Sequence, residues 1–228
     1  MIQAAEIHAQ GTHRLRPRRA TGAAKPDQFT GMARLCGEAD AARALDELAG
    51  VTDAARLGEA NLLPGIAIHE LLFGLPYAAT VNAAFCASPP GGRRFSGPLR
   101  GAWYAALDPE TAAREAAFHK ARELREIAWK TPESFAFDDL RADFHADFID
   151  LRAASLRARV LDPISYRYSQ ALARQGLQAG AGGFAYPSVR CRGGQRLACF
   201  RPPLVSGVRP GAGVEIHFPD AFAPPAFR

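Results

Sequence analysis

The sequence predicts an α+β fold, in which a mixed or antiparallel β core is flanked by helices. Residues 102–107, 143–151 and 216–218 have the residue types and alternation of strands. Asp-Pro pairs beginning at Asp108 and Asp162 are typical helix starts, because Asp caps a helix and Pro fits its first turn. These segments do not alternate strictly as β-α-β units, so a doubly wound parallel sheet is disfavoured.

The chain has 228 residues, of which 48% are apolar and 22% charged, enough to bury a core. We expect an N-terminal extension over residues 1–64, partly helical, and a domain over residues 65–228 that includes part of the extension. Within the extension, residues 13–15 favour a short strand. The apolar spacing in residues 39–49 and 52–62 predicts two helices.

In the middle of the chain, residues 94–96 are expected to form a short strand. The helix capped by Asp108 should run to about Ile127. The helix capped by Asp162 should end near Gly176, since glycine is a common helix terminator.

Two strands near the C-terminus, within residues 182–190 and 195–201, read as a β-hairpin with a two-residue turn at Gly193-Gly194. That register keeps Cys191 and Cys199 apart, so a disulfide between them is disfavoured. The four cysteines contain no C-x-x-C pair, so neither zinc binding nor thioredoxin-type chemistry is expected.

The net charge of +5 comes mainly from arginines that are scattered, apart from a cluster at Arg14, Arg16, Arg18 and Arg19. No aromatic residues are interleaved with this cluster, so we expect a solvated edge and no direct binding of nucleic acid. Contact with an anionic ligand or an acidic partner stays open. The chain has neither a run of 18 apolar residues nor the pattern of a signal peptide, which predicts a cytoplasmic protein without a membrane span.

Arg94 follows the glycines Gly91 and Gly92. Glycines let the backbone approach a phosphate, and a guanidinium binds phosphate through two hydrogen bonds, so Arg94 is a candidate phosphate ligand. Arg93 or Arg100 could serve instead. Taken alone, each of these arginines is an ordinary surface charge.

Glu115 is predicted to share a helix face with the small residues Ala112 and Ala116 and with His119. Small neighbours leave room for a ligand to reach the carboxylate, but the same pattern describes a partly exposed helix flank. His119 reads as an intrahelical partner of Glu115.

Several familiar sites are not indicated. The chain lacks the glycine-rich signatures of dinucleotide-binding and P-loop folds and the nucleophile elbow of hydrolases. Asp143, His145 and Asp147 suggest a metal site, but on a strand they share the face opposite Phe144 and Phe148. A solvated face is the better interpretation, and no metal is expected.

Five stretches, taken in their order and spacing, resemble the RES domain toxins, a family named for an arginine, a glutamate and a serine. The similarity covers roughly residues 65–205. The stretches are residues 92–96, 101–104, 110–116, 169–173 and 186–190.

The resemblance implies an ADP-ribosyltransferase-like fold that consumes NAD as its substrate, without a metal, and an Xre-type antitoxin as partner. By position it implies that Glu115, Arg94 and Tyr104 are catalytic. It also implies that Arg94, Tyr104, Ser188 and Arg14 bind NAD. The neighbouring Arg93 leaves open which arginine binds the diphosphate.

We therefore expect a type II toxin–antitoxin system toxin that cleaves NAD at the nicotinamide glycosidic bond by hydrolysis or phosphorolysis, depleting NAD and arresting growth. Glu115 would stabilise the oxocarbenium-like ribose, Tyr104 would pack on the nicotinamide end, and Ser188 would orient the ribose. One alternative is a mono-ADP-ribosyltransferase that modifies a cellular protein, which would be the acceptor of ADP-ribose. A second is a non-enzymatic basic binding protein.

Overall fold

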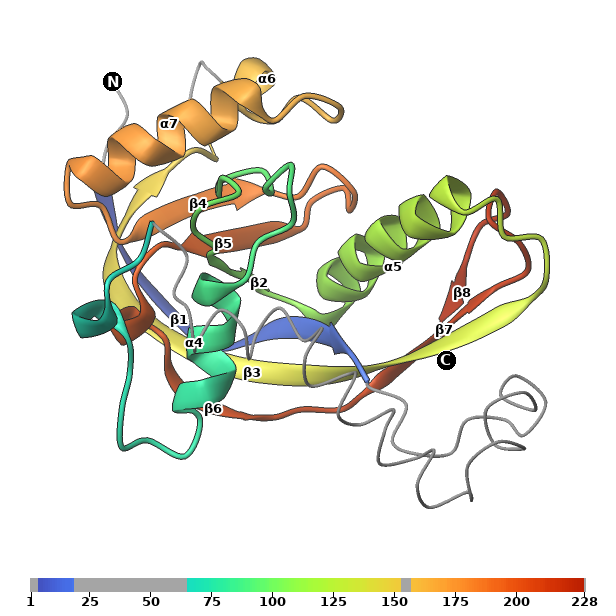
Figure 1. Cartoon of the computed structure of the whole chain (residues 1–228), viewed down its shortest axis with the longest axis horizontal. Helices are drawn as coiled ribbons and strands as arrows, with labels where there is room; N and C mark the ends of the chain where they lie inside the picture. The colour runs from blue at the N-terminus through green and yellow to red at the C-terminus, as the bar shows by residue number, and fades with distance from the viewer. Residues whose placement is uncertain (1–3, 19–64, 153–156, 228) are drawn as a thin grey trace, which may run out of the picture.

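The computed structural model describes residues 4–18, 65–152 and 157–227 (Figure 1). The helices expected at residues 39–49 and 52–62 lie outside these ranges. No helix in the described part of the chain is long and apolar enough to cross a membrane.

The described residues form strands and helices in a mixed order. The strands are β1 (Ala4–Pro17), β2 (Trp103–Ala106), β3 (Glu133–Asp150), β4 (Gly183–Pro187), β5 (Gln195–Cys199), β6 (Ser206–Pro210), β7 (Val214–Phe218) and β8 (Ala226–Phe227). The helices are α4 (Ala78–Cys86), α5 (Pro109–Glu126), α6 (Arg157–Val160) and α7 (Arg167–Gln178), with short 3-10 helices η2 (Ile68–Glu70) and η3 (Pro202–Leu204).

The strands form one eight-stranded sheet with the order β1-β2-β5-β4-β3-β7-β8, and β6 pairs with β3. Because β1 also pairs with β3, the path from β1 through β2, β5, β4 and β3 returns to its start. Among the described strands, β3–β4 is the one parallel pair. The predicted α+β fold with a mixed or antiparallel β core is confirmed, and the sheet is mostly antiparallel.

The 18-residue strand β3 runs along the sheet and pairs with β1, β4, β6 and β7 (Figure 1). Phe144 and Phe148 are buried on one face, whereas His145 and Asp147 are exposed on the other, as the alternation predicts. The strand begins ten residues earlier than residue 143, where the prediction placed its start, because its first part pairs with β7 and with the end of β1.

Helix α5 confirms the start signal at Asp108. The Asp108 carboxylate accepts a hydrogen bond of 2.7 Å from the backbone N–H of Thr111, and the helix ends at Glu126. Its buried face consists largely of alanines, including Ala113 and Ala117, and contacts β1, β2 and β7. Small side chains let the helix lie close to the sheet. They thereby bring Glu115, which is also on the buried face, near the strands.

The second Asp-Pro helix start is wrong in position. Asp162 Oδ1 accepts hydrogen bonds of 2.8 Å from the backbone N–H groups of Ile164 and Ser165, so these residues form a tight turn. Helix α7 begins after this turn, at Arg167, and ends at Gln178, near the end predicted at Gly176.

The hairpin of β4 and β5 is confirmed, but its predicted two-residue turn is wrong. Tyr186 lies opposite Arg196 and the connection spans residues 188–194. Cys191 lies in the connection and Cys199 ends β5, and both are buried free thiols.

The longer connection is stabilised by its own polar groups. Ser188 N–H donates a 2.7 Å hydrogen bond to the carbonyl of Gly194, and Ser188 Oγ accepts from the N–H groups of Arg190 and Cys191 at 3.1 and 3.0 Å. A side chain at Gly194 would collide with Thr111 at the start of α5. The loop therefore lies against that helix.

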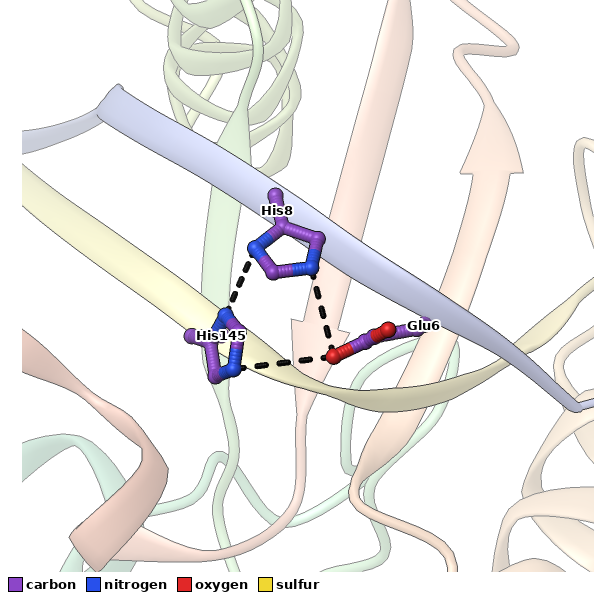
Figure 2. Close-up of side chains that lie close together, drawn as sticks. All are labelled: Glu6, His8 and His145. Atoms are coloured by element: carbon purple, nitrogen blue, oxygen red, sulfur yellow. Dashed lines mark hydrogen bonds and ion pairs between the residues drawn. The ribbon is translucent and has the colours of Figure 1, made fainter.

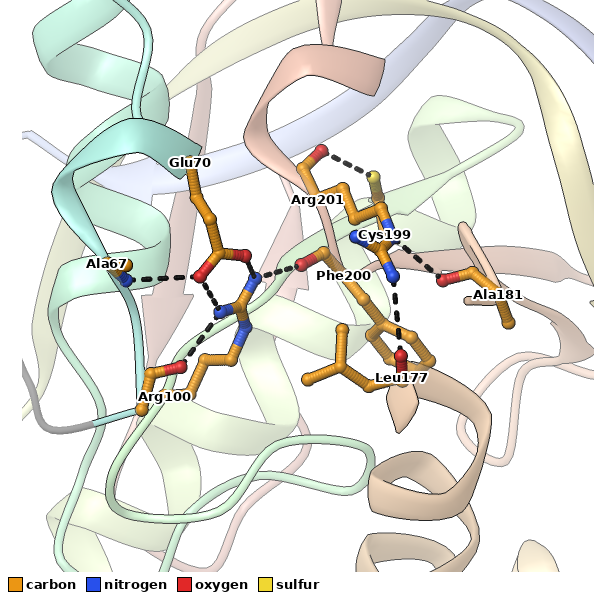
Figure 3. Close-up of polar contacts among 9 residues, drawn as sticks. Ala67, Glu70, Arg100, Leu177, Ala181, Cys199, Phe200 and Arg201 are labelled. Carbon is orange, nitrogen blue, oxygen red and sulfur yellow. Dashed lines mark hydrogen bonds and ion pairs between the residues drawn. The ribbon is translucent and has the colours of Figure 1, made fainter. Parts of the chain in front are cut away.

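Arg100, one of the candidate phosphate ligands, has a structural role instead (Figure 3). Its guanidinium binds the Glu70 carboxylate through two hydrogen bonds of 2.9 and 2.7 Å and donates to the carbonyls of Gly65 and Phe200, both at 2.8 Å. These contacts join η2 to the end of β5. Arg201 similarly donates to a carbonyl of α7 at 3.3 Å.

Candidate active site

A pocket opens among β1, β2, α5, β5 and the loops beside them. Its lining residues are His13, Arg14, Leu15, Arg93, Arg94, Tyr104, Ala112, Glu115, His119, Tyr166, Arg190 and Arg196. Its volume is about 130 Å³, well below the roughly 300–1,000 Å³ of pockets that enclose a drug-sized ligand. A larger ligand would therefore have only one end inside it.

Four of the five site residues expected from the sequence line this pocket: Arg14, Arg94, Tyr104 and Glu115. They come from β1, the loop before β2, β2 itself and α5. Ser188 does not line the pocket but contacts Glu115 from behind.

Glu115 is a buried carboxylate with 7% of its surface exposed. Its Oε1 accepts a 2.7 Å hydrogen bond from Ser188 Oγ, and its Oε2 lies 3.0 Å from Nη1 of Arg196. A carboxylate offers about four lone-pair sites. These two contacts therefore fix the orientation of Glu115 and leave acceptor capacity toward the pocket.

The Ser188 hydroxyl has its proton committed to Glu115. The backbone N–H groups of Arg190 and Cys191 both donate to Ser188 Oγ, which leaves the hydroxyl hydrogen to point at the carboxylate. The role expected for Ser188 was to orient a ribose. In this structure its contact is with Glu115.

Arg196 is a site residue that the sequence reasoning missed. It lies on β5 opposite Tyr186, with 14% of its side chain exposed, and pairs with Glu115. The next three residues of β5 are all buried. An arginine in such a strand needs a buried partner, and that signal could have singled it out.

Arg94 sits in a tight turn, so the strand predicted for residues 94–96 is wrong. Arg93 N–H donates to the Ser96 carbonyl at 2.7 Å and Ser96 N–H donates back at 3.3 Å. Gly92, with a φ of +69°, precedes the turn, and a side chain there would collide with the Ser96 carbonyl. Glycine is thus needed where the chain presents its two arginines.

The guanidinium of Arg94 is buried against the segment that follows α6. Its Nη1 donates to the carbonyls of Val160 and Asp162 at 3.2 and 2.8 Å, and its Cζ lies 4.8 Å from the ring centroid of Tyr166. These contacts hold Arg94 at the pocket wall. Arg93, by contrast, has an exposed side chain at the pocket mouth.

Tyr104 is held by its hydroxyl group. That oxygen accepts from Phe95 N–H at 2.9 Å and donates to Ser96 Oγ at 3.1 Å. Burial raises the pKa of Tyr104, so the phenol stays neutral. With its hydroxyl tied to the turn that carries Arg94, the ring forms a fixed wall of the pocket.

Arg14 lies inside the pocket, 4.6 Å from the ring centroid of Trp103. Burial, together with the nearby cations Arg93 and Arg196, lowers the pKa of Arg14 to about 9, so it remains charged at neutral pH. An anion bound here would relieve this repulsion.

The rest of the basic cluster behaves as the solvated edge that was expected. Arg18 Nε donates to Asp138 Oδ1 at 2.8 Å, and Arg16 lies 3.9 Å from the same carboxylate, with both arginine side chains more than half exposed. Arg19 lies outside the described residues. Arg14 thus differs from its neighbours in facing the site.

The charges of the pocket favour an anionic ligand. Five arginines line it, and within the described part of the chain Glu115 is the one carboxylate among the lining residues. Burial, followed by the effect of Arg93, lowers the pKa of His119 to about 4, so this histidine is neutral at pH 7. The pocket therefore presents one carboxylate among five arginines.

The comparison with family models decides the family. The model described as "RES domain" matches residues 68–219. The chain belongs to the RES domain family. The matched residues include Arg94, Tyr104, Glu115, Ser188 and the newly found Arg196. Arg14 lies before the first matched residue.

No curated protein matches the chain. Among solved structures, it is similar to a chain in the crystal structure of the M. tuberculosis MbcT–MbcA toxin–antitoxin complex, with 15% sequence identity and a TM-score of 0.40. That match covers 55% of this RES domain protein and 72% of the other chain.

Proposed function

We propose that this RES domain protein is the toxin of a type II toxin–antitoxin system and cleaves NAD at the bond between nicotinamide and ribose. The observation that carries the proposal is the buried Glu115 carboxylate, oriented by Ser188 and Arg196 at the base of an arginine-lined pocket. The resemblance of the site segments to RES domain toxins supports the choice of NAD.

The arginines would bind the diphosphate of NAD. Arg94 is fixed at the wall, Arg14 carries a charge without a carboxylate among its described contacts, and Arg93 is exposed at the mouth. Guanidinium groups bind phosphate oxygens in pairs, so two of these residues acting together suit a diphosphate. We assign the contacts with the diphosphate to Arg94 and Arg14.

Glu115 would act on the ribose. As the bond from ribose C1′ to the nicotinamide nitrogen breaks, its electron pair leaves with nicotinamide, which becomes neutral, and positive charge develops on the ribose. A fixed carboxylate stabilises that charge without reorganising. The oxygen of an acceptor then bonds to C1′ and loses a proton. If the acceptor is water, the product is ADP-ribose. If it is inorganic phosphate, the product is the 1-phosphate of ADP-ribose, and if it is a side-chain hydroxyl, the product is an ADP-ribosylated protein.

Tyr104 would pack on the nicotinamide end. A pocket of about 130 Å³ accommodates one end of a dinucleotide, and the ring of Tyr104 forms one of its walls. The adenosine end would then lie outside. Because Arg14 comes from β1, we also propose that this strand belongs to the catalytic domain, although it lies in the predicted extension.

We propose an Xre-type antitoxin as partner and the cytoplasm as the place of action, since both accompany NAD-consuming RES domain toxins. An antitoxin that covers the pocket would keep NAD out. Co-expression with such an antitoxin should then restore growth.

The function is tested by incubating purified protein with NAD labelled separately in nicotinamide and in adenine. We expect release of nicotinamide, and the adenine label identifies the acceptor as water, phosphate or added protein. No release in any of these conditions would contradict the proposal. Salt-dependent DNA binding in that case would favour the non-enzymatic alternative.

A further inference from the structure

A second cluster of chemically active side chains lies on the exposed face of the β1–β3 pair. Glu6 and His8 of β1 face His145 of β3 (Figure 2). His8 is directly opposite His145 in the register, and Glu6 is opposite Asp147. The four residues therefore form a two-by-two block on two paired strands.

The ligand atoms of this cluster have the spacing of a metal site. Glu6 Oε1 lies 3.2 Å from Nε2 of His8 and 3.5 Å from Nε2 of His145. In a tetrahedral site with bonds of about 2.1 Å, neighbouring ligand atoms are about 3.4 Å apart. The carboxylate and both imidazoles can thus reach one ion with small side-chain rotations.

The two imidazoles also lie against each other. The Nδ1 atoms of His8 and His145 are 2.6 Å apart, and their ring centroids are 4.0 Å apart. One ligand atom of each of the three side chains lies within 4.8 Å of the other two. Ring nitrogens and a carboxylate oxygen all offer lone pairs to a cation.

We propose that Glu6, His8 and His145 bind a divalent transition-metal ion such as Zn²⁺. Two imidazole nitrogens and one carboxylate oxygen are ligands that suit Zn²⁺ and Cu²⁺ rather than Mg²⁺ or Ca²⁺. Water would complete the coordination.

Such a site would clamp two strands that are far apart in sequence. His8 and His145 are separated by 137 positions. Strand β1 also carries Arg14 into the pocket, so an ion that joins β1 to β3 would stabilise the strand that positions this arginine. The proposal stands independently of the proposed function, because it concerns other residues on another surface.

The site is tested by titrating ZnCl₂ into untagged, chelator-treated full-length protein in a calorimeter. We expect one Zn²⁺ per chain. Removing even an outer partner of a metal ligand typically costs about 10- to 100-fold in affinity, so His8→Gln and His145→Gln should each weaken binding at least about tenfold. His69→Gln is the matched control, because His69 is exposed but lies outside the cluster.

A second readout counts the ligands directly. For this measurement the protein is loaded with Cu²⁺ in place of Zn²⁺. Its electron paramagnetic resonance spectrum should show coupling to two imidazole nitrogens in wild-type protein and to one in His8→Gln. Absence of stoichiometric Zn²⁺ binding in wild-type protein would overturn the proposal. So would an unchanged affinity in both variants, or loss of binding in His69→Gln alone. Circular dichroism would verify that each variant is folded.

Discussion

The hydroxyl of Ser188 donates a 2.7 Å hydrogen bond to Oε1 of Glu115, which lies 73 positions earlier in the chain. The contact joins the β4–β5 loop to helix α5. Because two backbone N–H groups occupy the lone pairs of the hydroxyl oxygen, the serine is oriented before any ligand binds. Ser188 is thus a positioning residue for the carboxylate.

Ser188→Ala should lower nicotinamide release by about 10- to 100-fold, since a hydrogen bond to a charged group contributes about 1.5–3 kcal/mol. In a Glu115→Gln background the same change should cost much less, because the two residues act as a unit. Release is measured for both single variants and the double variant. Additive losses would instead indicate that Ser188 acts on the substrate separately. Ser206→Ala, which removes an exposed serine, is the control.

Arg196→Gln should reduce both turnover and stability. The substitution leaves the buried Glu115 without its cation while retaining the Ser188 contact, so we expect a loss of about 2 kcal/mol in the free energy of unfolding. Urea denaturation measures the stability, and nicotinamide release measures the activity. Arg192→Gln, an exposed neighbour in the same hairpin, should change neither. If the two variants had the same stability and the same rate of nicotinamide release, Arg196 would have no specific role in the site.

Arg14→Gln should weaken NAD binding by at least about tenfold, because one guanidinium–phosphate contact is lost. Arg16→Gln removes the same charge two residues later, where the side chain is 55% exposed, and should leave binding unchanged. The Michaelis constant for NAD is compared between the two variants. If both raise it equally, the effect is one of general charge and Arg14 has no specific contact.

His119 should make stability depend on acid pH. Burial, then Arg93, lowers the pKa of His119 to about 4, whereas in the unfolded chain it is about 6.5. The unfolded state therefore binds more protons between these values, so stability is complete above pH 6.5 and declines as the pH falls towards 4.

His119→Gln should remove this part of the decline, which amounts to about 3 kcal/mol at most. Urea denaturation of wild type and variant at several pH values between 7 and 4 provides the measurement. Parallel pH dependences of the two proteins would show that His119 is not held neutral.

Local sequence signals predicted the elements that depend on local contacts. Asp108 and Pro109 fixed the start of α5, and the alternation around Phe144 identified the core of β3. The same Asp-Pro signal failed at Asp162, because its carboxylate is satisfied by the next backbone N–H groups and the chain turns before the helix. The residue sequence there is compatible with both outcomes.

The contacts of the site depend on pairing that the sequence does not reveal. Arg196 faces Tyr186 only because the β4–β5 connection is a seven-residue loop spanning residues 188–194, in place of the two-residue turn that Gly193-Gly194 favours. The pairing of His8 with His145 likewise depends on the register between two strands that lie far apart in the sequence, 137 positions at these residues. Resemblance to a family identified Glu115 and Ser188, but their mutual contact required the fold.

Nicotinamide release from NAD by Glu115→Gln, measured beside Glu110→Gln, tests the proposed chemistry most directly. Glu110 lies on the same helix but is exposed and pairs with Arg114. Loss of one transition-state contact typically costs about 10²–10³ in rate, so Glu115→Gln should release nicotinamide at least about 100-fold more slowly than wild type while still binding NAD, and Glu110→Gln should match wild type. Equal release by Glu115→Gln and wild type would contradict the assignment of Glu115 as the catalytic carboxylate.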